Sequence, residues 1–177
     1  LRLADNPALQ AAIQRGGPLI PVFIWAPEEE APWEPGAASR WWMHQSLVAL
    51  ATELAKTGSR LVIRCGPTLP ALQRLVKETK AGAVFWNRRY EPAVIARDQK
   101  VMTDLQAAGL EVGSVNGALL YESGTMQNKS GKPFQVFTPF WRTCLASAEP
   151  DAPLPAPRKL AAPQKWPASP PLAALKL

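Results

Sequence analysis

The sequence predicts an α/β fold: a doubly wound parallel sheet with helices on both faces. Three observations lead to this prediction. Short runs rich in Val, Ile and Phe alternate with stretches whose apolar residues recur at helical spacing. The helical stretches begin at capping residues and mostly end at glycines, and the connections are short. Such alternation indicates βαβ units, and right-handed crossovers place helices on both sides of the sheet.

The first helix is predicted at Asp5-Asn6-Pro7, where a capping side chain precedes a proline in the first turn. Gly16-Gly17 ends this helix, and residues 22–25 (VFIW) form a short strand. The loop "APEEEAPWEPGAAS" follows. Because only a few residues precede the first helix, the fold starts one strand late.

The alternation continues to the end of the predicted domain. Ser39 and Thr68 are predicted to cap the second and third helices, and Glu91 beside Pro92 to cap the fourth. The predicted helices span residues 6–16, 38–57, 68–79, 92–108 and 138–147. The predicted strands span residues 22–25, 60–64, 82–86 and 110–115.

Composition indicates one globular domain, residues 1–149, in a reducing compartment. The chain has 177 residues, 47% of them hydrophobic, with no apolar run long enough to cross a bilayer and no signal segment. Two distant cysteines argue against a disulfide framework, and we expect a cytoplasmic protein. The net charge of +6 mildly favours an anionic partner.

The last stretch, residues 150–177, changes character. It carries eight prolines between positions 150 and 171, which excludes a helix or a central strand there. We interpret it as an interdomain linker or as an extended strap on the surface.

No catalytic or metal site is predicted. The only histidine, His44, has no nucleophile elbow or metal-ligating partners around it. The segment "GTMQNKSGKP" has the wrong spacing for a phosphate loop, so a hairpin turn is the better interpretation.

The seven tryptophans and the segment "WNRRYEP" (residues 86–92) indicate a binding crevice. Trp25 and Trp86 fall at the carboxyl ends of predicted parallel strands, where open α/β sheets bind ligands. About two thirds of the tryptophans are expected in the core. The remaining polar residues of this segment either line the crevice or dock another segment: Asn87, Arg88, Arg89 and Tyr90.

Five motifs in order resemble the amino-terminal domain of the DNA photolyase/cryptochrome family. They are "LRLADNPAL", "IPVFIWAPEEE", "SRWWMHQSL", "WNRRYEP" followed by "ARD", and "KPFQVFTPFWR". The resemblance covers residues 1 to about 160. "IWAPEEE" with "SRWW" looks most like plant-type cryptochromes and the bacterial cyclobutane-dimer photolyases close to them.

The resemblance implies a Rossmann-like, five-stranded antenna domain, linked to a helical domain that binds FAD and damaged DNA. The implied function is light harvesting for a deoxyribodipyrimidine photolyase, an enzyme that splits cyclobutane pyrimidine dimers. Without the helical domain, the antenna domain and its linker are expected to be inactive. The alternatives are a blue-light-sensing cryptochrome and a nucleotide-binding α/β module without photochemistry.

The resemblance also implies an antenna chromophore over the carboxyl ends of the strands. In folate-binding relatives an Asn-Glu pair holds the pterin, whereas Ala93 and Val94 occupy those positions in this sequence. Methenyltetrahydrofolate in a modified pose, a deazaflavin or flavin, and an empty site therefore all stay open. The candidate cofactor-binding residues are Arg2, Asp5, Trp25, Glu28, Arg40, His44, Asn87, Arg88, Arg89 and Glu91.

Family members have a further strand before the match to "LRLADNPAL". Without it, the strands on either side of its place would lack a partner. We therefore expect either that upstream residues supply this strand or that another segment fills the slot.

Overall fold

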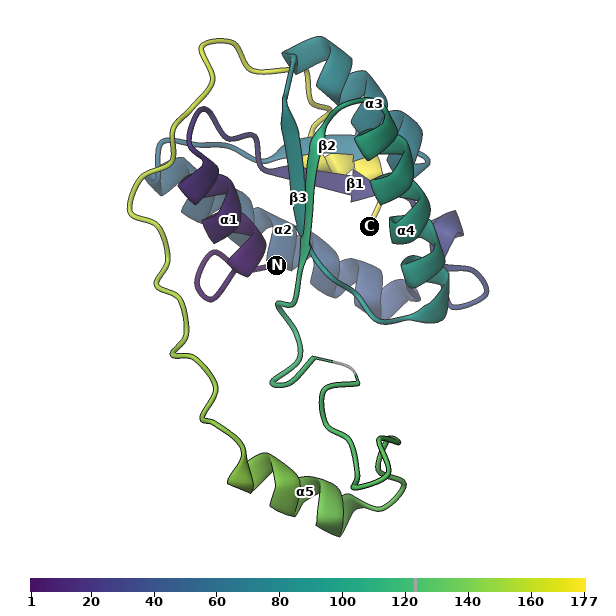
Figure 1. The fold of residues 1–177 in the computed structure, drawn as a ribbon. Coiled ribbons are helices and arrows are strands. Elements are labelled where there is room, and N and C mark those ends of the chain that lie inside the picture. The colour runs from purple at the N-terminus through teal and green to yellow at the C-terminus, as the bar shows by residue number, and fades with distance from the viewer. Residues whose placement is uncertain (123) are drawn as a thin grey trace.

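The computed structural model describes residues 1–122 and 124–177. Its strands and helices lie within a few residues of the predicted positions (Figure 1). The strands are β1 (Val22–Trp25), β2 (Val62–Cys65), β3 (Ala83–Asn87) and β4 (Glu111–Val115). The α-helices are α1 (Pro7–Arg15), α2 (Ala37–Lys56), α3 (Thr68–Thr79), α4 (Pro92–Ala107) and α5 (Phe137–Ala146), and the 3-10 helices are η1 (Pro27–Glu30) and η2 (Leu172–Leu175).

The strands form two separate parallel pairs rather than one five-stranded sheet. β1 pairs with β2 in the register Val22↔Val62, and β3 pairs with β4 in the register Ala83↔Glu111. The prediction of parallel strands with covering helices is confirmed, but within the described residues the sheet is divided. The reason is that no described strand lies between β1 and β3.

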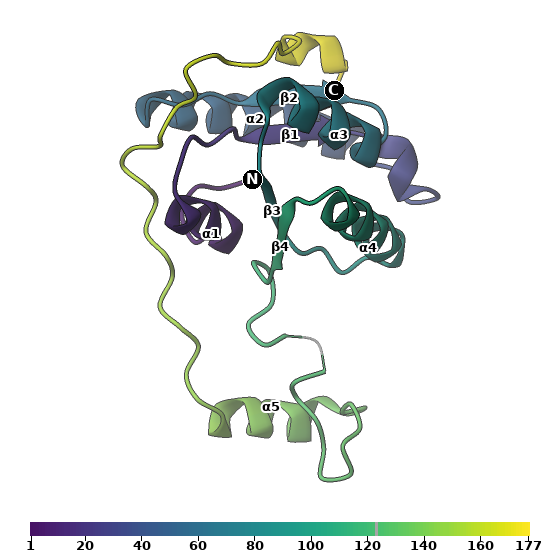
Figure 2. The same cartoon turned by 45° about the horizontal axis from the view of Figure 1, so that its top comes forward.

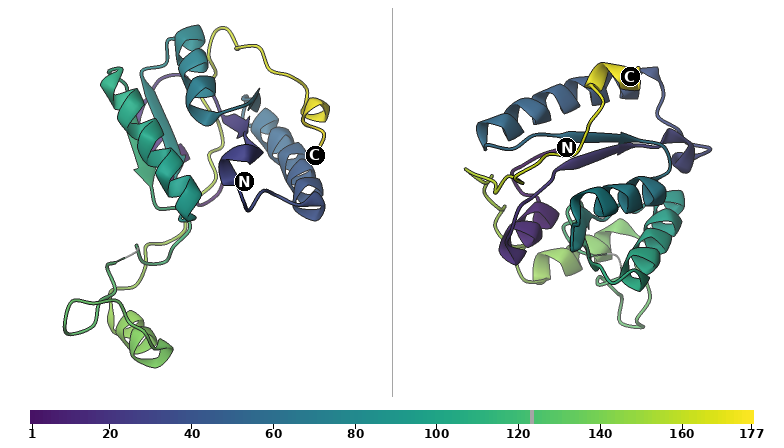
Figure 3. Two further views of the ribbon diagram at one scale, coloured as in Figure 1. Left: turned by 90° about the vertical axis from the view of Figure 1, so that its right-hand side faces the viewer. Right: turned by 90° about the horizontal axis from the view of Figure 1, so that it is seen from above.

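Helices cover both strand pairs. α2 and α3 lie on opposite sides of β1 and β2, and α1 and α4 lie on opposite sides of β3 and β4 (Figure 2). The view from above in Figure 3 shows the first of these sandwiches, with α2 and α3 on either side of the β1–β2 pair. The arrangement is an α/β fold in which each strand pair has its own two helices.

Two apolar clusters lie on opposite sides of β1, and the second of them spans both strand pairs. One joins Leu47 of α2 and Ile63 of β2 to Leu175 of η2. The other joins Leu72 of α3 to Val101 and Leu105 of α4, with Ile24 and Val84 packed against it. β1 therefore contributes Phe23 and Trp25 to one cluster and Ile24 to the other, as alternation along a strand requires.

The helix starts follow the predictions only in part. The Asn6 side chain accepts a hydrogen bond from the Leu9 N–H at 3.0 Å, with Pro7 in the first turn, as predicted. Ser39 does not cap α2, which begins two residues earlier, after Gly36. Thr68 is the first residue of α3 rather than its cap.

Residues 150–177 form an extended strap. The Asp5 N–H donates to the Leu154 carbonyl at 2.7 Å, and from Leu160 onward the strap runs along the outer edge of β2 and ends in η2. The Ile63 N–H donates to the Ser169 hydroxyl at 2.9 Å, and the Leu160 N–H donates to the Thr57 carbonyl at 3.0 Å. The Arg60 guanidinium lies 4.9 Å from the Trp166 ring centroid. The strap thus covers an edge that would otherwise be open to pairing.

α5 lies apart from the two strand pairs, connected to them by long irregular segments (Figure 1). The predicted hairpin turn precedes it, with an antiparallel bridge between Gln127 and Pro133. Within the described ranges, no helix is long and apolar enough to span a membrane.

Candidate functional site

The site is a cavity of about 790 Å³ between the two strand pairs. Apolar side chains of α1, α2, α3 and α4 line its interior, among them Leu9, Leu54, Leu72 and Val101. Polar residues line it at the carboxyl ends of β1 and β3. The cavity extends to the amino ends of these strands as well, and its carboxyl end, near Trp25 and Asn87, is the edge where open α/β sheets bind ligands.

Five of the ten predicted binding residues line this cavity, and five do not. Those lining it are Arg2, Trp25, Asn87, Arg88 and Arg89. Those outside the lining are Asp5, Glu28, Arg40, His44 and Glu91.

Arg88 is held within the chain. Its guanidinium donates to the Ser114 carbonyl at 2.7 Å and to the Glu122 carboxylate at 2.8 Å. Tyr90 donates to the same carboxylate at 2.9 Å. Burial, followed by the hydrogen bond to Glu122, raises the pKa of Tyr90 above its ordinary value. This network ties the loop that follows β4 to the end of β3.

Arg89 connects the two strand pairs. It donates to the Glu30 carboxylate at 2.6 Å and to the Glu91 carboxylate at 2.9 Å. The hydrogen bond to Glu30 is the main reason that the pKa of Arg89 is raised. The hydrogen bond from Arg89 likewise lowers the pKa of Glu91. Glu91 occupies the N-cap position of α4, but its carboxylate makes no capping bond, so the predicted cap is wrong.

Asn87 joins β3 to α1. Its side-chain oxygen accepts from the Ala8 N–H at 3.0 Å, and its amide group donates to the Asn6 side chain at 2.8 Å. Arg2 donates to the Gly117 carbonyl at 2.7 Å and pairs with Asp5 at 3.2 Å. These contacts fix the first residues of the chain at the carboxyl ends of β3 and β4.

Trp25 supplies the aromatic wall of the cavity. It is half-buried at the end of β1, and the Arg40 guanidinium lies 6.0 Å from its ring centroid. His44 is half-buried on α2, and its side chain makes no hydrogen bond within the described part of the chain. Glu28 is exposed, and of its polar groups only the backbone carbonyl, which accepts from the Ala31 N–H, makes a hydrogen bond there.

The important carboxylates are ones that the sequence analysis did not select. Glu29 accepts from the Thr68 N–H at 2.9 Å and so satisfies the first turn of α3. Glu30 holds Arg89, and Glu122 holds Arg88 and Tyr90. The run of three glutamates marks this segment in the sequence. Only the turn of η1 places Glu29 beside Thr68 and Glu30 beside Arg89. Glu122 lies in an irregular loop without any periodic signal.

The cavity fits a planar, largely apolar group better than a free anion. Within the described residues, Arg88 and Arg89 each contact a carboxylate, so their charges are compensated. Val94 is 1% exposed and belongs to the core. The positions that hold the pterin in folate-binding relatives therefore offer no polar partner, and a folate would need a different pose.

The expectation that most tryptophans are core residues is wrong. None of the seven is buried. Trp33, Trp41, Trp42 and Trp141 are exposed, and the other three are half-buried. Trp41 and Trp42 lie in adjacent positions of the first half of α2 with ring centroids 6.3 Å apart.

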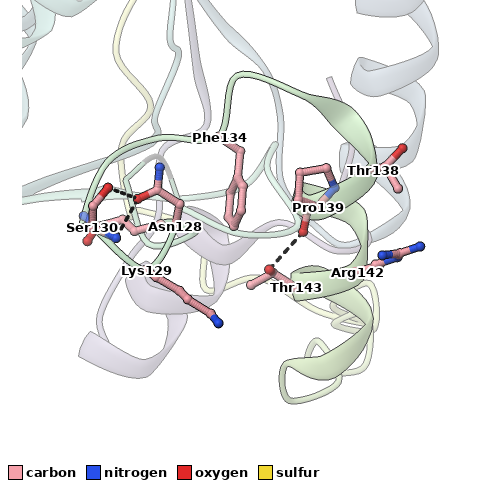
Figure 4. Close-up of a pocket in the computed structure, with 9 residues that line it drawn as sticks. Asn128, Lys129, Ser130, Phe134, Thr138, Pro139, Arg142 and Thr143 are labelled. Atoms are coloured by element: carbon pink, nitrogen blue, oxygen red, sulfur yellow. Dashed lines mark hydrogen bonds between the residues drawn. The ribbon is translucent and has the colours of Figure 1, made fainter.

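A second hollow, of about 730 Å³, lies between the hairpin and α5 (Figure 4). Asn128 organises the hairpin, because its side-chain oxygen accepts from the Ser130 N–H at 2.9 Å and from the Lys132 N–H at 3.1 Å. These backbone donors are therefore occupied, which agrees with a hairpin rather than a phosphate loop. Across the described ranges, no group of three or more His, Cys, Asp or Glu side chains is placed to hold a metal.

The sequence is similar to curated photo-lyases and cryptochromes. The chain is 46% identical over 177 residues to the deoxyribodipyrimidine photo-lyase of Agrobacterium fabrum, which covers 100% of this chain and 36% of that protein. It is 41% identical over 162 residues to cryptochrome-1 of Arabidopsis thaliana, covering 90% of this chain and 24% of that protein. The chain thus spans about a quarter to a third of the length of these relatives.

The fold is also similar to solved structures of photolyases. A bacterial class III photolyase from Agrobacterium tumefaciens superposes with a TM-score of 0.92 and 45% identity, over 99% of this chain and 36% of that one. An archaeal photolyase from Sulfolobus tokodaii with two FAD molecules, described as implying a novel light-harvesting cofactor, gives a TM-score of 0.74 and 26% identity, over 99% of this chain and 38% of that one. The family model described as DNA photolyase matches residues 1–158. The chain belongs to the DNA photolyase family.

Proposed function

We propose that this chain is the light-harvesting amino-terminal part of a deoxyribodipyrimidine photolyase that repairs cyclobutane pyrimidine dimers. The observation that carries the proposal is 46% identity to such an enzyme across the whole chain. The chemistry, electron transfer from reduced FAD to the dimer, belongs to a helical domain of the whole protein. That domain also binds the damaged DNA, because a flipped-out dimer needs a pocket beside the flavin.

The residues that would hold the antenna chromophore of this proposal lie at the carboxyl ends of β1 and β3. When bound, it absorbs light and passes the excitation to FAD. Trp25 would provide the aromatic wall for its planar face, with the Arg40 guanidinium 6.0 Å from the Trp25 ring centroid. Arg89 and Glu30 close the cavity rim beside it. A flavin, a deazaflavin and a folate in a modified pose remain the candidate chromophores.

The exposed face of α5 is the contact surface for the rest of the whole protein in this proposal. Phe137, Trp141 and Leu145 follow one another at helical spacing and are 70%, 45% and 67% exposed. An apolar stripe of this kind marks an interaction surface. The share of the relatives that this chain does not cover leaves ample polypeptide to pack on it. Trp141→Ala is expected to lower the melting temperature of the whole protein and to leave that of the 177-residue chain unchanged.

A repair assay tests the proposed activity. The whole protein, carrying reduced FAD, is mixed with DNA that contains cyclobutane dimers, and the dimers are counted after illumination and in the dark. We expect loss of dimers only in the light, and no loss with the 177-residue chain alone. An absence of light-dependent repair by the flavin-loaded whole protein would contradict the proposal.

A cryptochrome is the second candidate, supported by 41% identity to cryptochrome-1 of Arabidopsis thaliana. The same assay separates the two, since a receptor without repair activity would bind FAD and respond to blue light but leave the dimers intact.

A further inference from the structure

The hairpin and α5 together form a positively charged unit, residues 124–148, which is called the hairpin–α5 unit below. Its sequence contains three cationic side chains, Lys129, Lys132 and Arg142, and no aspartate or glutamate. This short stretch therefore carries half of the net charge of +6. Because α5 lies apart from the two strand pairs (Figure 1), the carboxylates of the strand pairs do not compensate these charges.

The three cations differ in this respect from the arginines at the cavity. Arg88 and Arg89 each bind a carboxylate, at 2.8 Å and 2.6 Å. The side chains of Lys129, Lys132 and Arg142 are exposed and make no ion pair or hydrogen bond within the described residues. Like charges without compensation repel one another and attract counter-ions, so this unit favours an anionic partner.

The hairpin holds its two lysines in a defined turn. The Asn128 side-chain oxygen accepts from the Ser130 and Lys132 N–H groups, and the Asn128 N–H donates to the Lys132 carbonyl at 2.8 Å. Phe134, which follows the turn, packs edge-on against Phe140 of α5, with ring centroids 6.1 Å apart. The turn and the helix are joined by this contact, which reduces the cost of bringing their cations to one partner.

The hollow of about 730 Å³ lies between two of these cations. Lys129 lines it from the hairpin and Arg142 from α5 (Figure 4). The backbone N–H groups that could bind a single small anion are already bonded to Asn128. Charges carried by separate exposed side chains suit instead a polyanion with phosphates in succession, such as the backbone of a nucleic acid.

The cationic face of α5 is distinct from its apolar stripe. Thr138 and Arg142 line the hollow, whereas Trp141 is the middle residue of the stripe. Successive residues of an α-helix are about 100° apart around its axis, so Arg142 and Trp141 point in clearly different directions. An anionic partner at the hollow therefore leaves the stripe accessible to the rest of the whole protein.

We propose that the hairpin–α5 unit binds the phosphate backbone of double-stranded DNA through Lys129, Lys132 and Arg142. The choice of DNA as the polyanion rests on the proposed function, in which the whole protein acts on DNA. The contact is independent of base sequence, because phosphate contacts carry no sequence information. It adds to the contacts of the helical domain and holds the duplex beside the dimer rather than the dimer itself.

Two triple variants that lose the same charge in different places test the proposal. One replaces the cations of the hairpin–α5 unit: Lys129→Gln, Lys132→Gln and Arg142→Gln. The control replaces three exposed cations in or just after α3 that make no ion pair within the described residues: Arg74→Gln, Lys77→Gln and Lys80→Gln. Binding of the 177-residue chain to a labelled, undamaged duplex is measured by fluorescence anisotropy between about 50 and 200 mM salt.

The unmodified chain is expected to bind the duplex at low salt and to lose affinity steeply as the salt concentration rises. The hairpin–α5 variant should bind about tenfold or more weakly at low salt, and its slope of log K against log salt should be smaller by about 2 to 3. The α3 variant should change both quantities little. Equal weakening in the two variants would show that only net charge matters and would overturn the proposal, as would an absence of binding by the unmodified chain.

The same two variants of the whole protein separate DNA from a protein partner. The hairpin–α5 variant should bind DNA more weakly and keep its melting temperature. A lower melting temperature with unchanged DNA affinity would mean that the cations bind the remainder of the polypeptide, and would contradict the proposal. Binding to undamaged DNA requires neither light nor repair. Intact DNA binding without repair would therefore contradict only the proposed function, and repair without this DNA contact only the present inference.

Discussion

Arg89, which follows β3, donates to Glu30, which follows β1, across 2.6 Å. This ion pair joins the carboxyl ends of two strand pairs that share no backbone hydrogen bond among the described residues. Glu30 is the less exposed partner, at 24% against 42% for Arg89. The pair therefore fixes the rim of the cavity as well as the relation between the two halves of the fold.

Glu30→Gln is expected to lower the stability of the chain by roughly 0.5–1 kcal/mol, because the pair is only partly buried. Urea unfolding followed by tryptophan fluorescence measures the change. Glu53→Gln is the matched control, since Glu53 pairs with Lys56 on the exposed face of α2. An equal loss in both variants would mean that the Arg89–Glu30 pair has no special role between the strand pairs.

Asn87→Ala is expected to cost about 1–2 kcal/mol, since the Ala8 N–H and the Asn6 side chain both lose a partner. Gln127→Ala in the distant hairpin serves as the control. Gly117→Ala should act in the same direction as Asn87→Ala, because a Cβ at Gly117 would lie 2.7 Å from the Asn87 side-chain oxygen. The idea fails if both variants unfold at the same urea concentration as the unmodified chain.

Leu175→Ala tests whether the strap stabilises the fold. Leu175 is 6% exposed and packs with Leu47 and Ile63, so its truncation should cost about 2–3 kcal/mol. Leu145→Ala removes the same atoms from a side chain that is 67% exposed and should change the stability of the 177-residue chain little. Similar unfolding midpoints for the two variants would show that the strap is not docked on α2 and β2.

Tyr90 gives a pH dependence with a defined sign. Its pKa is raised by burial and then by Glu122, so the folded state favours the neutral phenol. The resulting stability is fully present below the unfolded pKa of about 10 and is lost as the pH rises through the folded value. Absorbance titration in a Tyr121→Phe background follows Tyr90 alone.

Glu122→Gln should bring the Tyr90 titration back toward its ordinary pKa, because the carboxylate that favours the neutral phenol is removed. An unchanged titration curve in this variant would contradict the assigned contact between Tyr90 and Glu122.

The sequence predicts the helices, the strands and their direction well because these depend on local signals. Asn6 with Pro7 marks the start of α1, and apolar spacing marks the strand and helix faces. The division of the sheet could be anticipated only as a missing strand. Local patterns cannot predict which of the neighbouring glutamates binds Arg89. Glu28 and Glu30 differ only in the direction in which η1 turns their side chains.

The sequence predicts where the candidate site lies, but it does not predict which residues contact one another there. Trp25, Asn87 and Arg88 come together because parallel strands end at one edge. Arg88 meets Glu122 across a sequence separation of 34 residues, through a loop without periodicity. The exposure of the tryptophans was misjudged because bulk and apolarity favour the core, whereas Trp41 and Trp42 lie on a helix face that no described segment covers.

The action spectrum of dimer repair by the whole protein tests the central claim most directly. Repair per absorbed photon is measured from the near-ultraviolet to the blue, for the unmodified protein and for Trp25→Ala, with the absorption spectrum of bound reduced FAD as reference. A light-harvesting domain predicts a repair band beyond that of FAD, which weakens in Trp25→Ala while repair through FAD itself is retained. A spectrum that coincides with that of FAD in both proteins would contradict the antenna role, and an absence of repair at every wavelength would contradict the photolyase assignment.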